Sequence, residues 1–308
     1  MRTPLFTSML HFCNHSRGET AMPRIALLGL LLAAFPVVAA DPPARVVALS
    51  VQKRNDVQIV KKLTKPDGTI VDEITTEARP VAMTQNFDPT KSAVVICDMW
   101  DDHWCASAAK RCDGLAKTTA PLIEELRKAG VTIIHAPSDC MDYYKDHPAR
   151  VRTLAVKATE PPKNKQLADP PLPIDDSDGG CDDGKTPFRK AWSKQHEAIK
   201  IDGDKDYITD SGKVVYSILA DRGIKTVFVL GVHTNMCVLH RTFAIKQLRK
   251  WDVDCLLVRD LTDAMYNPKM KPFVTHEAGT NLVIEFIERH WCPTTTSAML
   301  LNALGVKK

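Results

Sequence analysis

Short apolar runs and longer helical repeats alternate along most of this chain. Runs of aliphatic and β-branched residues, typical of strands buried in a parallel sheet, lie at 93–97, 131–136, 198–201, 226–230 and 253–260. Apolar residues at helical spacing predict helices over 116–129, 148–158, 213–222, 237–251 and 280–290. This alternation predicts a three-layer α/β/α, Rossmann-like fold on a doubly wound, mostly parallel sheet of about six strands, the last near 293–297.

Two segments depart from this alternation. Residues 46–84 alternate apolar and polar positions on either side of Pro66-Asp67-Gly68, which predicts a β-hairpin-like lead-in. We therefore divide the chain after residue 40 into a lead-in, 41–91, and a main domain, 92–308. Residues 139–184 are rich in Pro, Asp and Gly and lack strong periodicity, which is typical of a lid, a binding loop or a disordered segment.

The first forty residues carry a targeting signal. Met22-Pro-Arg precedes an apolar run at 25–38, and small residues end that run before Asp41. This pattern predicts a secretory signal peptide over 22–40, because the run is too short to span a bilayer comfortably. Residues 1–21 show no pattern, so we interpret them as an extension or a mis-assigned start; a genuine cytosolic tail is the alternative. The prediction is an exported protein, periplasmic or secreted, with no membrane contact after signal removal.

Composition narrows the set of partners. The chain has 41 basic and 37 acidic residues, a formal net charge of +4, with both signs interspersed. Because the basic residues neither cluster nor alternate with aromatic ones, we expect no nucleic-acid partner. Nine cysteines are present, and in an oxidising compartment some could pair, although their spacing does not fix the connectivity. No Cys/His spacing matches a zinc site, so we expect neither a structural metal nor a cofactor.

Candidate chemistry lies where two predicted strands end. The strand at 226–230 passes through Gly231 into a polar turn, and Cys237 then begins a helix. A helix N-terminus favours a thiolate, whereas a small residue packed under the helix is the alternative interpretation of Cys237. Asp98 ends the strand at 93–97, at the same edge of a parallel sheet, and its carboxylate could accept the thiol proton. A plain helix N-cap is the alternative for Asp98.

These two segments resemble a known family. AVVICDMW at 93–100 and GVHTNMCVL at 231–239 are similar to the isochorismatase-like cysteine hydrolases, which include nicotinamidases and other amidases. The more specific part is G-V-x-T-x-x-C-V at 231–238, and the resemblance covers about 92–297. DMWDDHWC, RDLTDAMYNP and ERHWCPT look like an exported bacterial subgroup. The resemblance implies an isochorismatase-like fold and a small-molecule substrate.

The resemblance also implies roles for the matched residues. Cys237 would be the nucleophile, and Asp98 would be its general base and later the acid for the leaving amine. A cis peptide bond between Val232 and His233 would direct the His233 N–H, with that of Cys237, at the developing oxyanion. One such donor contributes about 2.7–4 kcal/mol to lowering the barrier.

A lysine completes the family's catalytic set, and its identity here stays open. Lys200 lies in the strand predicted at 198–201, about where the family places its lysine. The segment that follows is DGDKDYITDSG instead of an aromatic-rich one, so Lys205 competes with Lys200. A strand-edge lysine facing solvent is the alternative for Lys200. If neither lysine reaches Cys237, the amidase mechanism is in doubt.

Aromatic residues near Asp98 are candidates for a substrate pocket, with core packing as the alternative. They are Trp100, His103, Trp104 and, from the long loop, Tyr144. Some family members bind a metal through an Asp-x-His pair and a later His. His135, Asp139 and His147 do not have that spacing, so we expect no metal.

Together these features predict a cysteine-dependent hydrolase that cleaves a carbon–nitrogen, amide-type bond of a small molecule through a thioester-like intermediate. One alternative is a non-catalytic binding protein that retains the fold. Another is an isochorismatase-type vinyl-ether hydrolase, which in the family needs no cysteine nucleophile. Family members often pair or form rings, so the resemblance leaves a homo-oligomer open. The sequence does not identify the substrate, because specificity is expected to lie in the loop 139–184, which carries no recognisable motif.

Overall fold

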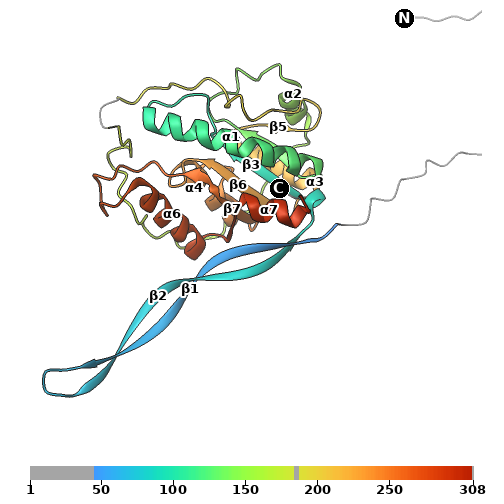
Figure 1. The fold of residues 1–308 in the computed structure, drawn as a ribbon. Helices are drawn as coiled ribbons and strands as arrows, with labels where there is room; N and C mark the ends of the chain where they lie inside the picture. The colour runs from blue at the N-terminus through green and yellow to red at the C-terminus, as the bar shows by residue number, and fades with distance from the viewer. Residues whose placement is uncertain (1–44, 184–186, 307–308) are drawn as a thin grey trace, which may run out of the picture. The chain divides into compact units, whose positions relative to one another are not determined.

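Eight strands form one sheet in the described part of the chain, residues 45–183 and 187–306 of a computed structural model (Figure 1). The strand order is β2-β1-β8-β7-β6-β3-β4-β5. The strands are β1 (Val47–Thr64), β2 (Ile70–Phe87), β3 (Ser92–Cys97), β4 (Thr132–Ala136), β5 (Tyr207–Ile208), β6 (Thr226–Val232), β7 (Asp254–Asp263) and β8 (Thr294–Thr295). The predicted signal peptide, 22–40, and the extension before it lie outside the described residues.

Helices cover both faces of the sheet, because the alternate residues of its central strands are apolar on both sides. On one face, Val94 and Ile96 pack with α1 and α7; on the other, Ala93 and Val95 pack with α3, α5 and α6. The helices are η1 (Pro89–Lys91), α1 (Ala106–Lys128), α2 (Pro148–Ala155), α3 (Gly212–Arg222), α4 (Cys237–His240), α5 (Ile245–Lys250), α6 (His276–His290) and α7 (Ser297–Leu304). The result is the predicted three-layer α/β fold.

The strand order reverses at the centre of the sheet. β3 pairs in parallel with both β4 and β6, the chain having wound outward in one direction from β3 to β5 and in the other from β6 to β8. In such sheets, ligands bind beyond the carboxyl ends of the strands at the point of reversal. Asp98 directly follows β3, and the turn that leads to Cys237 directly follows β6. The fold therefore places both candidate residues at this switch point.

The lead-in hairpin belongs to the same sheet. β1 and β2 pair antiparallel along 18 residues each, around the predicted turn, and β1 joins the remaining strands through β8 at Gln52 and Thr294. Beyond Asp56, which pairs with Arg289, both strands pair only with each other among the described residues. This antiparallel addition and the pairing of β5 bring the sheet to eight strands instead of about six.

Two predictions of secondary structure were wrong. The segment 198–201 is not a strand; the edge strand β5 lies further on, within the segment DGDKDYITDSG at 202–212. The single helix predicted over 237–251 is two short helices separated by residues 241–244, of which the first, Arg241, has φ −58° and ψ 153°. A side-chain contact of Arg241, described below, accounts for that break.

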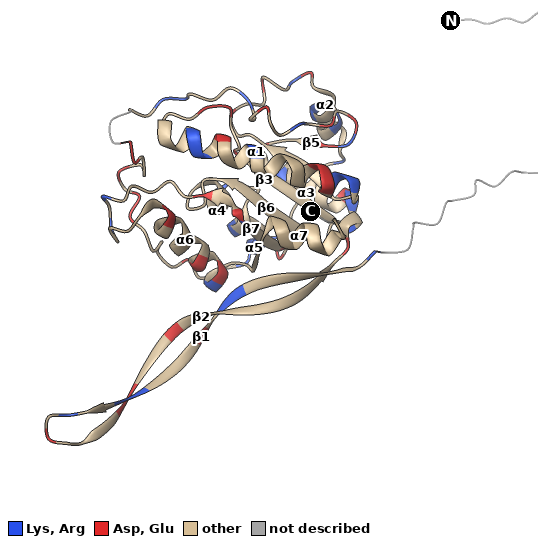
Figure 2. Ribbon diagram, viewed as in Figure 1, with Lys and Arg blue, Asp and Glu red and all other residues tan. Residues whose placement is uncertain are grey.

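Residues of both charges are interspersed along the described chain. Lys and Arg residues alternate with Asp and Glu residues over helices and loops (Figure 2). Within residues 45–183 and 187–306, no helix combines the length and the apolar character needed to cross a bilayer.

Candidate active site

The site is built on the close approach of β3 and β6. Gly231 has φ 114°, and a Cβ there would lie 1.9 Å from the carbonyl oxygen of Cys97. Only glycine allows the two backbones to come together at this point. The approach brings the residue that follows β3 next to the turn that follows β6, so it determines the distance between Asp98 and Cys237.

Asp98 is a buried carboxylate held by donors from two directions. It has φ 48° and is 0% exposed. Its Oδ1 accepts a hydrogen bond from the Ser138 backbone N–H at 2.7 Å, and its Oδ2 accepts one from Nε of Arg241 at 3.0 Å. Burial raises the pKa of Asp98 above its usual value, against the opposing effects of Arg241, Cys237 and Ser138. It does not cap a helix, since α1 begins only at Ala106.

Arg241 supplies the cation at this site. Its guanidinium contacts Asp98 at 3.0 Å and lies 3.8 Å from a carboxylate oxygen of Asp139. Burial lowers the pKa of Arg241, but the charge of Asp98, its hydrogen bond and the nearby cysteines together outweigh burial and raise the pKa above its ordinary value. The helix ends at His240, and Arg241, in extended backbone, turns to Asp98. Sequence reasoning missed Arg241, although a residue four positions after Cys237 lies on the same face of the helix predicted there.

Cys237 is the first residue of α4, beside Asp98. Burial and the nearby charge of Asp98 raise the pKa of the thiol, whereas the charge of Arg241 and the backbone N–H of His233 lower it. Burial prevails, so the group rests as a thiol and not as a free thiolate. The expectation that a helix terminus alone lowers the pKa of this thiol was wrong, because α4 has only four residues and the site is largely desolvated.

The turn between β6 and α4 has the conformation that the resemblance implied. The peptide bond between Val232 and His233 is cis. The His233 backbone N–H interacts with the Cys237 sulfur, and the His233 carbonyl accepts from Met236 at 3.0 Å and from Val238 at 3.1 Å. Burial lowers the pKa of the His233 imidazole to about 3, so the ring is neutral near pH 7. The turn thus directs a backbone donor, and not the imidazole, toward the nucleophile.

A cavity of about 510 Å³ opens beside Cys237. Asn235, His240 and Arg241 line it, together with Leu172 and Asp176 from the long loop. The loop predicted to cover the site therefore does contribute to it. Sequence reasoning did not find these two residues, since nothing local to the loop indicates which of its side chains face the nucleophile.

The aromatic residues predicted to line the pocket lie elsewhere. Trp100 stacks on Trp192 with ring centroids 4.2 Å apart and donates through Nε1 to the Ser138 carbonyl. The hydroxyl of Tyr144 accepts from the Gln195 N–H at 2.8 Å. Trp100, His103, Trp104 and Tyr144 pack together or against neighbouring rings, and the cavity at Cys237 is lined by other residues. Cys237 packs against the cluster that contains Trp100 and Tyr144, so these aromatic residues support the nucleophile without lining the cavity.

The predicted lysines are not in contact with the Cys237–Asp98 pair. Lys200 is exposed, in the segment before β5, and its carbonyl accepts from Arg127 at 3.0 Å. Lys205 is exposed too, and its ammonium lies 3.8 Å from Asp202. In the part of the chain that the structure describes, Arg241 occupies the place that we expected a lysine to fill. With no strand at 198–201, Lys200 is not carried to the switch point.

The residues that could have formed a metal site have other partners. His135 is fully buried between Gln195 and Asp206, 2.9 Å from each. Asp139 lies near Arg241, and the side chain of His147 accepts from the N–H of Ala149 at the start of α2. Their contacts serve packing, charge pairing and helix capping.

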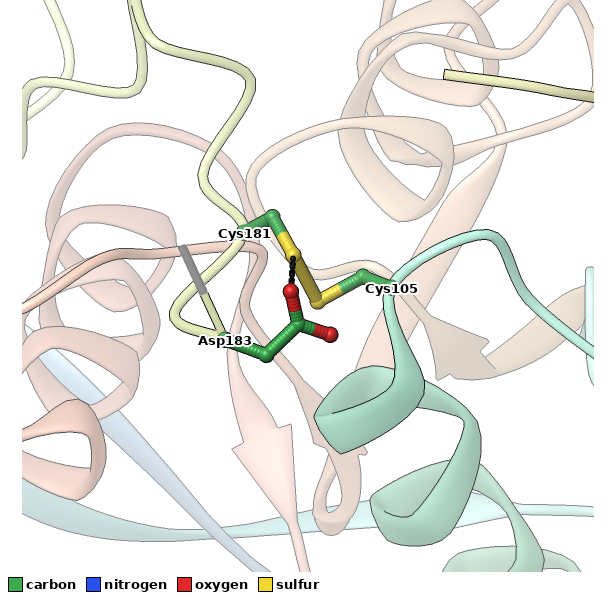
Figure 3. Close-up of side chains that lie close together, drawn as sticks. All are labelled: Cys105, Cys181 and Asp183. Atoms are coloured by element: carbon green, nitrogen blue, oxygen red, sulfur yellow. Dashed lines mark hydrogen bonds between the residues drawn. A yellow bond between two sulfur atoms is a disulfide. The ribbon is translucent and has the colours of Figure 1, made fainter. Parts of the chain in front are cut away.

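A disulfide joins the long loop to the start of α1. Cys105 and Cys181 are bonded, with Cα atoms 5.7 Å apart, and a carboxylate oxygen of Asp183 lies 3.1 Å from the Cys181 sulfur (Figure 3). The three side chains are close enough for a metal cluster, but both sulfurs are already engaged in the bond. Cys237 is a free cysteine.

The comparisons with known proteins give likenesses of fold only. No protein-family model matches the chain, and no curated protein matches it. Similar solved structures include a cysteine hydrolase from Pseudomonas syringae pv. phaseolicola 1448A, with 17% identity, 71% of this chain and 94% of that chain covered, and a TM-score of 0.44. An isochorismatase from Pseudomonas putida KT2440 has 11% identity, covers 69% and 91%, and has a TM-score of 0.41. At these identities and scores the likeness carries no functional argument, and the proposal below rests on the geometry of the site.

Proposed function

We propose that this protein is a cysteine-dependent hydrolase that cleaves an amide-type carbon–nitrogen bond of a small molecule. The observation that carries the proposal is the placement of Cys237, Asp98 and Arg241 together at the switch point, at the edge of a 510 Å³ cavity. A thiol, a buried base and a fixed cation are the parts that acyl transfer through sulfur requires. The substrate is small, as the volume of the cavity implies.

In the first step, the Cys237 sulfur attacks the carbonyl carbon while its proton passes to Asp98. The thiol of the free enzyme is protonated, so proton transfer accompanies attack. The pKa of Asp98 is raised toward the working pH, and a group with such a pKa can both accept this proton and return it. Asp98 then protonates the leaving amine, and a thioester remains on Cys237. Water, deprotonated by Asp98, attacks the thioester and releases the carboxylate product.

The oxyanion of each tetrahedral intermediate would lie near the His233 backbone N–H. That N–H already interacts with the Cys237 sulfur, so it is directed to where the carbonyl oxygen must sit. The imidazole is neutral and buried, and it contributes no charge. Donors fixed by the fold need no reorganisation during the reaction, which is why they stabilise transition states effectively.

Arg241 would keep Asp98 ionised in the resting enzyme. Burial raises the pKa of the carboxyl and the charge of Arg241 lowers it, and a protonated Asp98 cannot accept the thiol proton. A guanidinium is charged at all working pH values, unlike a lysine ammonium, whose pKa falls readily on burial. The substitution of arginine for the family's lysine is therefore compatible with the chemistry.

A panel of primary amides and nitriles, assayed for ammonia release, tests the proposal. We expect turnover of at least one small amide, and loss of about 10³-fold or more of it in Cys237→Ala. Iodoacetamide should modify Cys237 in preference to the other free thiols, because those are buried and Cys237 is only partly buried. Peptide mapping identifies the modified residue.

Cys112→Ala is a matched control, since Cys112 is a buried free thiol outside the cavity. It should retain wild-type ammonia release. Activity that survives in Cys237→Ala would remove the cysteine from the mechanism and favour the vinyl-ether hydrolase. Binding of amides with no turnover in the wild type would favour the non-catalytic binding protein.

A further inference from the structure

The acidic end of the long loop is folded onto the body of the protein by its own side chains. Asp178 accepts from the amide of Asn267 at 2.8 Å, and Asp182 pairs with Arg111 at 2.9 Å. The loop N–H of Asp175 donates to the carbonyl of Lys271 at 2.9 Å. These contacts come from α1 and from the connection between β7 and α6, so the segment 175–183 is a fixed wall and not a loose lid.

Two further constraints hold the same wall. The Cys105–Cys181 disulfide bonds it covalently to the start of α1 (Figure 3). Gly180, with φ 71°, lies so near Met265 that a Cβ would be 2.2 Å from its carbonyl oxygen. A side chain in this wall therefore has a defined position relative to Cys237.

Asp176 is the acidic residue of this wall that reaches the cavity. Its Oδ2 accepts from the amide of Asn235 at 2.7 Å. Asn235 is itself fixed, since it exchanges hydrogen bonds of 2.8 and 3.0 Å with the backbone of Met265. Asp176, Asn235 and Cys237 line the same cavity. A carboxylate is thus held against the nucleophile's turn, at the same cavity as Cys237.

The carboxylate of Asp176 forms no ion pair among the described residues. Within the described ranges no lysine or arginine pairs with it, and its hydrogen-bond donor, Asn235, is neutral. Arg241, which also lines the cavity, is engaged by Asp98 and Asp139. His240 also lines the cavity, and burial lowers its pKa, so it is neutral near pH 7. The cavity therefore carries a fixed negative charge that a ligand can meet.

We propose that Asp176 is a specificity-determining residue that selects small amides carrying a cationic group, such as an ammonium, away from the scissile bond. The inference rests on the proposed hydrolase activity and names its substrate class. A cation in the substrate would pair with the Asp176 carboxylate while the amide carbonyl lies at Cys237 and the His233 N–H. An anionic substrate would be repelled by the Asp176 carboxylate and would bind less well.

Three amides of similar length test this inference: 4-aminobutanamide, neutral pentanamide and anionic glutaramate. We expect the wild-type kcat/KM to fall in that order. Asp176→Asn keeps the shape and an oxygen for Asn235 but removes the charge, so it should reduce the preference for 4-aminobutanamide over pentanamide by about 10- to 100-fold. Asp178→Asn removes one charge from the same wall, outside the cavity, and should leave the preference unchanged.

Equilibrium binding separates this inference from the proposed reaction. The Cys237→Ala protein should bind 4-aminobutanamide more tightly than pentanamide, and adding Asp176→Asn should abolish the difference, both measured by calorimetry at low salt. That result with no turnover in the wild type would leave the inference standing and overturn the hydrolase. A preference that Asp176→Asn leaves intact, or a wild-type preference for glutaramate, would overturn the inference.

Discussion

A single arginine replaces the expected lysine, and its position explains its effect. Arg241 lies four residues after Cys237, where the backbone leaves the helix, and its Nε contacts the carboxylate that follows β3. One side chain thereby links the nucleophile's helix to the base. Lys200 has no comparable route, because it is exposed on a segment without a strand.

Replacing Arg241 with methionine should move the acidic limb of the pH profile. The carboxyl of Asp98 already has a raised pKa, and removing the guanidinium raises it further. Activity needs ionised Asp98, so the pH at which kcat/KM reaches half its plateau should shift upward, with kcat at neutral pH reduced about 100-fold. Arg241→Lys, which preserves the charge, should shift the limb much less. An acidic limb unmoved in Arg241→Met would show that Arg241 does not control Asp98.

A second residue-scale prediction concerns Asp206, which lies outside the cavity. Burial raises its pKa, but hydrogen bonds from His135 and Arg127 outweigh burial and lower the pKa from 3.8 to about 2. A depressed carboxyl pKa stabilises the fold above the unfolded value, and this contribution is lost as the pH falls from about 4 to about 2. The free energy of unfolding, measured by urea at several pH values, should fall across this window. Asp206→Asn should be less stable at pH 7 and flatter below pH 4, whereas Asp204→Asn, at an exposed carboxylate, should follow the wild type.

At the scale of elements, the site depends on how closely β3 and β6 approach. The turn at the end of β6 combines Gly231, a cis peptide bond and a four-residue helix, so local propensity describes it poorly. The prediction of one helix over 237–251 was wrong, because the backbone leaves the helix at Arg241, whose side chain contacts Asp98. Elsewhere the elements followed their apolar spacing, as in α1 and α3, where Gly130 and Gly223 follow the ends of the helices.

Gly231→Ala should therefore destabilise the protein. The new Cβ would lie 1.9 Å from the Cys97 carbonyl oxygen and would occupy a φ that L-residues rarely adopt. We expect a loss of about 3 kcal/mol or more in the free energy of unfolding, from urea denaturation. Gly114→Ala is the matched control: Gly114 is exposed in α1 with no atom within 4 Å of the new Cβ, so that substitution should be neutral or stabilising. Equal stability of the two variants would contradict the role assigned to Gly231.

At the scale of the whole molecule, the outer hairpin and the site are separate features of one sheet. The hairpin joins the rest of the sheet at Gln52, and Arg54 and Asp56 form ion pairs with the end of α6. Its outer part exposes several apolar side chains. A two-stranded ribbon is marginal without other support. In the described structure, no side-chain contact joins the outer hairpin, residues 57–77, to Asp98 or Cys237 at the switch point.

Shortening the hairpin should leave the site intact. Joining Val57 to Glu77, which are paired in register, through an Asn-Gly turn removes only residues that pair with one another. We expect ammonia release and the rate of Cys237 alkylation to stay within about twofold of the wild type, and the midpoint of thermal unfolding to move by a few degrees at most. A large loss of alkylation rate would mean that the outer hairpin supports the active site.

The sequence by itself determined the layers of the fold and the pair Asp98–Cys237, because apolar period and strand ends are local properties of the chain. It also located the hairpin turn and the cis peptide bond, the latter through a family resemblance. Tertiary structure alone decided the cation on Asp98, the residues that line the cavity, the disulfide partner of Cys105 and the number of strands. Each of these depends on which distant segments come together in the folded chain, and the spacing of residues along the sequence does not determine that.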